Sequence, residues 1–244
     1  MRRGSHFDAV ASAAYEDSIP RHVMQHLTRR RVALVQAASR AGRVLDVGCG
    51  TGTLLNGLPG QEYQRFGIDL SIGMLRQARA KDGKLRLSLA SATALPFDDE
   101  TFDVVVCAAV LHHIAEPAAV GQVISEMIRV TTYGGTAVIW DHNPTNPYWP
   151  ILMRRVPQDI GEERLIPREE LLSALRVLQE RYALTVCLRQ MTFVPDFTPV
   201  WALKGLAVVE RALERTPFLR HLSAHNVALV TKLAKGGGNG HVGR

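Results

Sequence analysis

The sequence predicts an α/β protein built on an open sheet of mainly parallel strands. From residue 43 onward, short apolar runs alternate with helical segments, which is typical of β-α-β units with right-handed crossovers. The run at 103–107 is mostly valine, as expected for a central strand buried on both faces. A chain of 244 residues, of which 46% are hydrophobic and 21% are charged, can bury a sizeable core of this kind.

The individual elements follow from the same patterns. Amphipathic spacing predicts at least one helix within residues 7–40. Strands are expected at 44–47, 65–68, 85–89, 103–107 and 136–140, with helices at 52–58, 72–81 and 118–131. After a proline-rich loop at 141–150, Pro167 is expected at the first position of a helix that runs to about Arg181. Two more strands are expected at 183–189 and 226–233, separated by an insertion with a helix near 200–215 that would cover a substrate.

Composition excludes several classes of protein. The longest apolar run, Val104–Leu111, is far shorter than the roughly 18 residues of a membrane span, and the N-terminus has no apolar signal segment, so a cytoplasmic protein is expected. Cys49, Cys107 and Cys187 lack the spacing of a disulfide framework or a zinc knuckle. The formal charge of +6 would suit an anionic partner, but the basic residues are scattered apart from Arg29–Arg31.

A glycine-rich turn follows the first expected strand. Counting from Gly48, the dinucleotide pattern G-x-G-x-x-G would need glycine where Thr53 stands, and no lysine follows the glycines as in a phosphate-binding P-loop. Asp46 would repel a pyrophosphate but favour a cationic group. Asp69 ends the second strand, where a carboxylate can accept both hydroxyls of a ribose. The predicted ligand is a nucleoside with a cationic arm, and S-adenosylmethionine (SAM) fits this description.

Five blocks of sequence resemble the class I SAM-dependent methyltransferases in order and spacing across residues 44–114. They are Asp46–Gly52, Gly67–Ser71, Leu95–Phe97, Thr101–Val105 and Val110–His113. The resemblance implies a Rossmann-like, seven-stranded, doubly wound sheet with the last strand antiparallel, N-terminal helices, and a helical cover inserted before the last strand. Beyond residue 141 the resemblance is looser and points to bacterial methyltransferases of biosynthetic and glycoconjugate gene clusters, without identifying a substrate.

The same resemblance implies how the chain is organised. Residues 1–235 would form a single methyltransferase domain, and 236–244 a flexible tail. Within the domain, 7–40 would be an N-terminal helical lid, 41–142 the SAM-binding core, and 143–225 the substrate-side half with its insertion.

Cofactor contacts can be assigned by matching motifs residue by residue. Asp46, Gly48 and Gly50 would line the methionine arm, Asp69 the ribose, and Leu70 the adenine face. Ser91 replaces an acid that usually meets the adenine, which would weaken or remove one contact. The predicted cofactor-binding set is Tyr15, Asp46, Gly48, Cys49, Gly50, Asp69, Leu70, Ser91, Ala92 and Cys107. Tyr15 resembles a lid tyrosine, although a core aromatic residue at helical spacing is an equally good interpretation.

Methyl transfer from a sulfonium needs an aligned nucleophile and, for a hydroxyl, a base. His113 follows the fourth strand and His142 the fifth, both at carboxyl ends where ligands bind in open sheets, so these two are the candidate catalytic residues. His112 shares the place of His113, packing roles compete at all three, and proximity alone is an alternative to any base. Asp141 and Asn143 offer metal-ligating oxygens, but the matching third acid is missing, so no metal is expected.

The sequence therefore predicts methyl transfer from SAM to a small, largely apolar metabolite or glycolipid-like acceptor, at oxygen. The segment Phe193–Phe218 is expected to form an apolar wall over the acceptor, with a homodimer face or a membrane-surface face as alternatives. A nucleic-acid (RNA) methyltransferase is the rival enzyme, but Cys107–Val110 is not the motif that holds a base amine. A non-catalytic SAM-binding module stays open.

Overall fold

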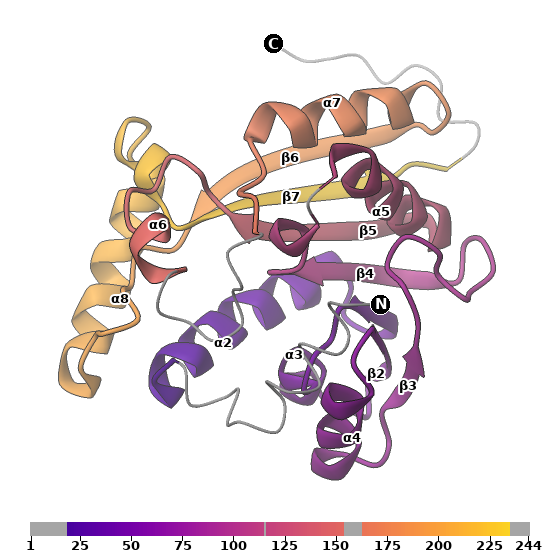
Figure 1. Ribbon diagram of the computed structural model, residues 1–244, viewed down its shortest axis with the longest axis horizontal. Helices are drawn as coiled ribbons and strands as arrows, with labels where there is room; N and C mark the ends of the chain where they lie inside the picture. The colour runs from indigo at the N-terminus through magenta and orange to yellow at the C-terminus, as the bar shows by residue number, and fades with distance from the viewer. Residues whose placement is uncertain (1–18, 115, 154–162, 235–244) are drawn as a thin grey trace.

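A seven-stranded sheet organises the computed structural model, which describes residues 19–114, 116–153 and 163–234 (Figure 1). The strand order is β3-β2-β1-β4-β5-β7-β6. The strands are β1 Gly42–Val47, β2 Tyr63–Asp69, β3 Arg86–Leu89, β4 Phe102–Ala108, β5 Thr131–His142, β6 Leu184–Met191 and β7 His225–Lys232. Neighbours from β3 to β5 pair in parallel, whereas β7 pairs antiparallel with both β5 and β6. The predicted Rossmann-like sheet with an antiparallel last strand is confirmed.

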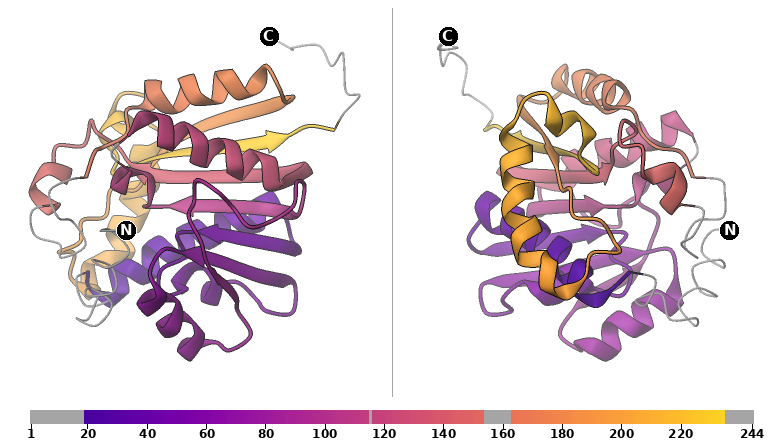
Figure 2. Two further views of the ribbon diagram at one scale, coloured as in Figure 1. Left: turned by 45° about the vertical axis from the view of Figure 1, so that its right-hand side comes forward. Right: turned by 90° about the vertical axis from the view of Figure 1, so that its left-hand side faces the viewer.

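Helices cover both faces of this sheet, as the two views in Figure 2 show. The α-helices are α2 Arg21–Ala38, α3 Thr53–Gly57, α4 Ile72–Lys81, α5 Pro117–Val130, α6 Trp149–Leu152, α7 Arg168–Gln179 and α8 Val200–Arg215, and the 3₁₀-helices are η2 Leu111–His113 and η3 Leu219–Leu222. One buried cluster joins α5 and α7 to one face, and a second joins α2, α3 and α4 to the other. The valines of β4 are fully buried between the two clusters, as their sequence predicted.

Two local expectations differ from the structure. Pro167 does not occupy the first helical position but precedes it, with an extended ψ of 144°, and α7 begins at Arg168. The fifth strand begins at Thr131 instead of near residue 136 because it contains an irregularity: Phe102 pairs with Thr131, but Val104 already pairs with Thr136. Gly134, at a φ of +82°, supplies the left-handed conformation that this bulge requires.

The helix α8 lies at the edge of the sheet where the parallel strands end (Figure 1). It is joined to α2 by a hydrogen bond from His26 and an ion pair from Arg30, both to Glu210. The helix expected near 200–215 is therefore present between β6 and β7. The predicted tail at 236–244 and the first part of the N-terminal lid lie outside the described residues.

None of the described helices combines the length and the apolar character that crossing a membrane requires.

Candidate functional site

The glycine turn after β1 is tight and closely packed. Gly48, Gly50 and Gly52 all have positive φ, between +51° and +75°, which favours residues without a Cβ. The amides of Gly48 and of the next residue both donate to the carbonyl of Ile68 at 2.9 Å. A Cβ on Gly48 would lie 2.4 Å from a methyl group of Val110. The backbone of this turn is therefore held against β2 and the end of β4, and a side chain at Gly48 would not fit.

Asp69 fixes the turn from the end of β2. One carboxylate oxygen accepts a hydrogen bond from the amide of Gly50 at 2.9 Å, and the other accepts one from the amide of Ser71 at 2.9 Å. Ser71 in turn caps α4 by accepting a hydrogen bond from the amide of Met74 at 3.0 Å. A carboxylate only accepts hydrogen bonds, so a ligand that binds beside Asp69 would have to offer donors.

A cavity of about 380 Å³ opens beside Asp69. Its walls come from the glycine turn, the end of β2, the segment after β3, and the segment after β4. They include the predicted cofactor residues Gly48, Gly50, Asp69, Leu70, Ser91 and Ala92. The hydroxyl of Ser91 lies 2.8 Å from that of Thr93, so part of its hydrogen-bonding capacity is used within the loop.

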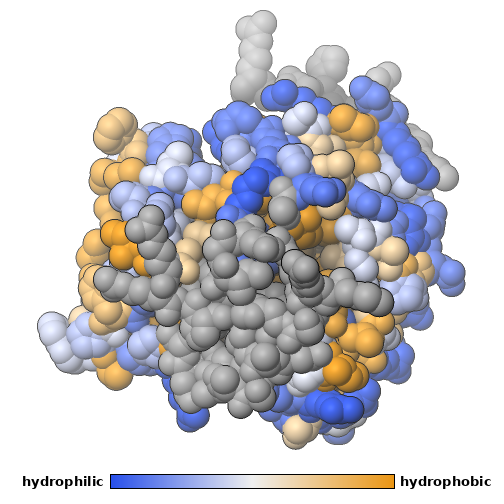
Figure 3. Space-filling model, in the orientation of Figure 1, coloured by the Kyte–Doolittle hydropathy of each residue, from blue (hydrophilic) through white to orange (hydrophobic). Residues whose placement is uncertain are grey.

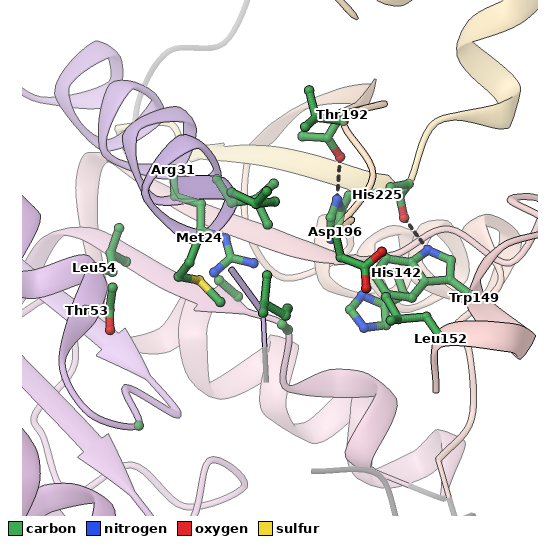
Figure 4. Close-up of a pocket in the computed structure, with 18 of the residues that line it drawn as sticks. Met24, Arg31, Thr53, Leu54, His142, Trp149, Leu152, Thr192, Asp196 and His225 are labelled. Atoms are coloured by element: carbon green, nitrogen blue, oxygen red, sulfur yellow. Dashed lines mark hydrogen bonds between the residues drawn. The ribbon is translucent and has the colours of Figure 1, made fainter. Parts of the chain in front are cut away.

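A second, larger cavity of about 770 Å³ lies at the carboxyl ends of β1, β4 and β5 (Figure 4). Asp46 and Arg31 both line it. Burial raises the pKa of Asp46 to about 7; the positive charge of Arg31 opposes this shift and the negative charge of Asp69 adds to it. This end of the cavity therefore offers an acidic and a basic group to a ligand that carries both charges.

The two cavities meet. Gly48, Gly50, Ala109 and His113 belong to the walls of both. Ala109 adopts a φ of +59°, which is unusual for a residue with a side chain, and its amide donates to the carbonyl of Trp140 at 2.8 Å. One ligand can therefore occupy the smaller cavity and present a group to a second ligand in the larger one.

The carboxylate of Asp141 organises the wall between β4 and β5. It accepts four hydrogen bonds: from the amides of Val110 (3.2 Å) and Leu111 (2.7 Å), from Nδ1 of His112 (2.8 Å), and from the amide of His142 (2.7 Å). Burial alone would raise the pKa of Asp141, but His112 and the His142 amide hold it below its ordinary value. Because an ionised carboxylate only accepts, His112 must carry its proton on Nδ1.

Aromatic rings stack along the same wall. The ring of His142 lies between His112, at a centroid distance of 4.0 Å, and Trp149, at 3.5 Å with an angle of 8° between the planes (Figure 4). Burial and the neighbouring histidines lower the pKa of His142 well below its ordinary value, so the ring is neutral at pH 7. Its Nδ1 is buried without a hydrogen-bond partner among the described residues.

Possible metal ligands also meet here. One ligand atom each from His112, Asp141 and His142 lies within 4.8 Å of the others. Both Asp141 oxygens already accept two hydrogen bonds each, however, and the two imidazole rings stack almost in parallel instead of converging on a point. Their geometry is therefore that of a hydrogen-bonded wall, and we assign it no metal.

The predicted cofactor residues are distributed unevenly. The larger cavity adds Asp46 and Cys49 to the six residues of the smaller one. Cys107 belongs to neither wall, because its side chain packs in the core between the sheet and α5. Tyr15 lies outside the described residues. Of the two candidate catalytic residues, His142 lines the larger cavity and His113 lines both.

Sequence reasoning missed Arg31, Trp149 and His225, which all line the larger cavity. A usable signal existed only for Arg31. It follows Val23 and Leu27 at intervals of four residues, so it lies on the same face of α2 as the buried Val23.

Strand order, glycine turn and paired cavities at the carboxyl ends define a class of protein: a nucleoside-binding class I methyltransferase fold. A solved SAM-dependent methyltransferase of Thermotoga maritima, titled a possible histamine N-methyltransferase, shares this fold with a TM-score of 0.68 at 17% identity. That match covers 94% of this chain and 99% of the other.

Relatives in sequence place the chain within that class. Residues 45–139 match the family described as "Methyltransferase domain", so the chain carries a class I SAM-dependent methyltransferase domain. A demethylmenaquinone methyltransferase of Renibacterium salmoninarum is 34% identical over 53% of this chain and 56% of its own length. A phosphatidylethanolamine N-methyltransferase of Cereibacter sphaeroides is 41% identical over 47% of this chain and 57% of its own length. The chain spans about half the length of the curated relatives it matches.

The buried histidines should make the stability of the fold depend on pH. Burial, assisted by Arg31, lowers the pKa of His225 to about 3, whereas the unfolded chain titrates near 6.5. Its contribution to stability is complete above pH 6.5 and is lost as the pH falls towards 3, because only the unfolded chain takes up the proton. Between pH 7 and pH 5 this one residue should cost about 2 kcal/mol of unfolding free energy.

Denaturant unfolding at a series of pH values measures this loss. His225→Gln should reduce the pH-dependent part by about 2 kcal/mol, whereas His221→Gln, at an exposed position, should leave it unchanged. Equal pH dependence in wild type and His225→Gln would contradict the assignment.

Proposed function

We propose that the protein transfers a methyl group from SAM to a small, largely apolar, quinone-like or lipid-like acceptor. The observation that carries this proposal is the pair of cavities that share Gly48, Gly50, Ala109 and His113. A donor whose adenosine fills the smaller cavity would pass these four residues into the larger cavity and meet an acceptor there, and such alignment is the main requirement of a direct displacement.

The smaller cavity suits the adenosine of SAM. Asp69 would accept hydrogen bonds from the ribose hydroxyls, and Leu70 would cover one face of the adenine. Asp46 would bind the ammonium group of the methionine arm. Arg31, which carries the opposite charge to Asp46, would bind the carboxylate of the same arm. When bound, SAM supplies an electrophilic methyl group on a sulfonium.

The larger cavity suits an apolar acceptor. Tyr148, Trp149, Leu152, Phe193 and Phe197 contribute aromatic or aliphatic surface to its walls. Two relatives are named for a quinone and for a phospholipid acceptor, which supports the same class here. The aromatic wall would also exclude water from the reacting atoms.

Oxygen is the acceptor atom that we propose, with His113 as the base that removes its proton. His113 lines both cavities at their junction, and a carboxylate oxygen of Glu163 lies 3.8 Å from its Nδ1. His142 is less suited to this role, because its ring is stacked on both faces and burial lowers its pKa. Nitrogen is the second candidate atom, since one relative is named an N-methyltransferase.

Label transfer tests the proposed activity. Purified protein incubated with methyl-labelled SAM and an extract of its native cell should move the label into a small organic-soluble product and release S-adenosylhomocysteine. Label found in RNA would support the rival nucleic-acid activity instead. If SAM binds but no S-adenosylhomocysteine forms with any extract, the protein is a binding module and the proposed function is wrong.

Asp69→Ala should weaken SAM binding by about 1–3 kcal/mol, because charge-assisted hydrogen bonds to the ribose and the fixed position of the glycine turn are both lost. Isothermal titration calorimetry measures the change. Asp69→Asn is the matched control, since it keeps the shape and one acceptor oxygen, and its loss should be smaller. Unchanged affinity in Asp69→Ala would refute the ribose assignment.

His113→Gln should lower kcat about 100-fold or more while SAM affinity stays within about twofold, because a general base acts on the rate and not on cofactor binding. The exposed His221→Gln serves as the control and should keep full activity. A decrease of less than about tenfold, with an unaltered dependence of kcat on pH, would show that proximity alone suffices.

A further inference from the structure

Two acidic side chains help attach the helix α8 to the protein. The only fully buried residue of this helix is Glu210, at 1% exposure. Its carboxylate accepts hydrogen bonds from His26 (2.8 Å), Arg30 (2.6 Å) and the amide of Phe193 (2.8 Å). One turn later Glu214 pairs with Arg30 at 2.8 Å. The inward side of α8 also carries the half-buried Leu203, Leu206 and Leu213, so both apolar and charged contacts attach the helix.

The opposite face of α8 and the following turn carry a concentration of exposed apolar side chains. Eight of the fourteen large hydrophobic residues that are exposed in the described part of the chain fall within residues 197–222. They are Phe197, Val200, Trp201, Val208, Val209, Phe218, Leu219 and Leu222. Figure 3 shows hydrophobic surface along the edge of the molecule formed by α8. We call residues 197–222 the α8 surface.

Basic side chains are interleaved with these apolar ones. Trp201, Lys204, Val208, Arg211 and Arg215 follow one another at intervals of three and four residues, so they share one side of the helix, and all five are exposed. Arg220 adds a further exposed cation in η3. The two acidic residues of the α8 surface, Glu210 and Glu214, both turn inward to Arg30. The outward side is therefore apolar and purely cationic.

We propose that the α8 surface docks on an anionic lipid bilayer. An amphipathic helix with large apolar residues and lysine or arginine beside them lies in the bilayer interface, where its apolar side chains enter the acyl boundary. Each basic residue near an anionic membrane adds attraction. Trp201, 86% exposed at the start of the helix, has both the apolar ring and the polar N–H that suit this interface.

A second copy of the chain is the less suitable occupant. In a two-fold symmetric dimer the same patch would face itself, so that Lys204, Arg211 and Arg215 would meet their own counterparts with no exposed acid between them. A bilayer of anionic headgroups instead supplies the opposite charge.

Docking would place the larger cavity close to the membrane. Phe197 lines that cavity and is 70% exposed, and it lies in the turn just before α8, four residues ahead of Trp201. The cavity therefore reaches the surface directly beside the proposed docking site. The docking itself does not depend on which acceptor is methylated.

Vesicle binding tests the proposal. Full-length protein is mixed with vesicles of phosphatidylcholine alone or of equal parts phosphatidylcholine and phosphatidylglycerol, and the bound fraction is measured by flotation. Binding to the anionic vesicles should be at least about tenfold stronger and should weaken with added salt. Trp201 is a built-in reporter, because Trp140 and Trp149 are buried: its emission should shift to the blue and its quenching by acrylamide should fall on binding.

Variants locate the contact. The double variant Trp201→Ser with Val208→Ser should reduce partitioning about tenfold or more, and Arg211→Gln about fivefold. Val177→Ser, 64% exposed on α7, is the matched control and should bind like wild type. Trp201 and Val208 line neither cavity, so thermal unfolding and the affinity for SAM verify that each variant is folded.

Two results would overturn the proposal whatever the variants do. One is equal binding of the wild-type protein to both kinds of vesicle. The other is a dimer in sedimentation whose Trp201 is already protected from acrylamide without lipid, which would assign the α8 surface to a second copy of the chain.

Discussion

The site depends most on one buried carboxylate. The Asp141 carboxylate accepts hydrogen bonds from two amides of the segment after β4, from the imidazole of His112 and from the amide of His142. These bonds connect the carboxyl ends of β4 and β5 into one wall of the cavity. Four donors around one charge compensate its burial, and their loss would leave an ion without water or partners. The amide of Val110, whose side chain packs beside Gly48, donates to the same carboxylate. Asp141 therefore positions both the glycine turn and the histidine stack.

Apolar runs and helical spacing predicted the individual strands and the main helices, whereas the seven-stranded sheet with its antiparallel last strand was implied by the resemblance to class I methyltransferases. Each of the seven strands overlaps a range that apolar runs predicted, because the sheet is covered on both faces and its central strands leave almost no choice of residue. The short helix α6, which begins within the predicted loop at 141–150, was not predicted. Predictions were less accurate at boundaries. The bulge in β5 rests on the left-handed Gly134, and Pro167 at a helix start is compatible with either of two adjacent positions.

Only those residues of the candidate site that belong to short, continuous sequence motifs could be predicted from the sequence. Asp46, Gly48 and Asp69 lie within short runs whose spacing carries the chemistry. Trp149 and His225 reach the same wall from segments far apart in the chain, and nothing in their own neighbourhood indicates it. His225 arrives there because β7 runs antiparallel to β5 and pairs it directly with His142. Contacts of this kind between residues distant in sequence follow from strand topology and register, which the patterns of a single sequence do not specify.

The charged attachment of α8 has a mechanical consequence. Arg30, which pairs with Glu210 and Glu214, is the neighbour in sequence of Arg31, which lines the larger cavity. Because both side chains belong to one continuous helix, α8 cannot tilt or slide without either breaking its ion pairs or moving α2 with it. A displacement of α8 would thus reach the cavity wall by two routes: through α2 to Arg31, and through the hydrogen bond from the amide of Phe193 to Glu210.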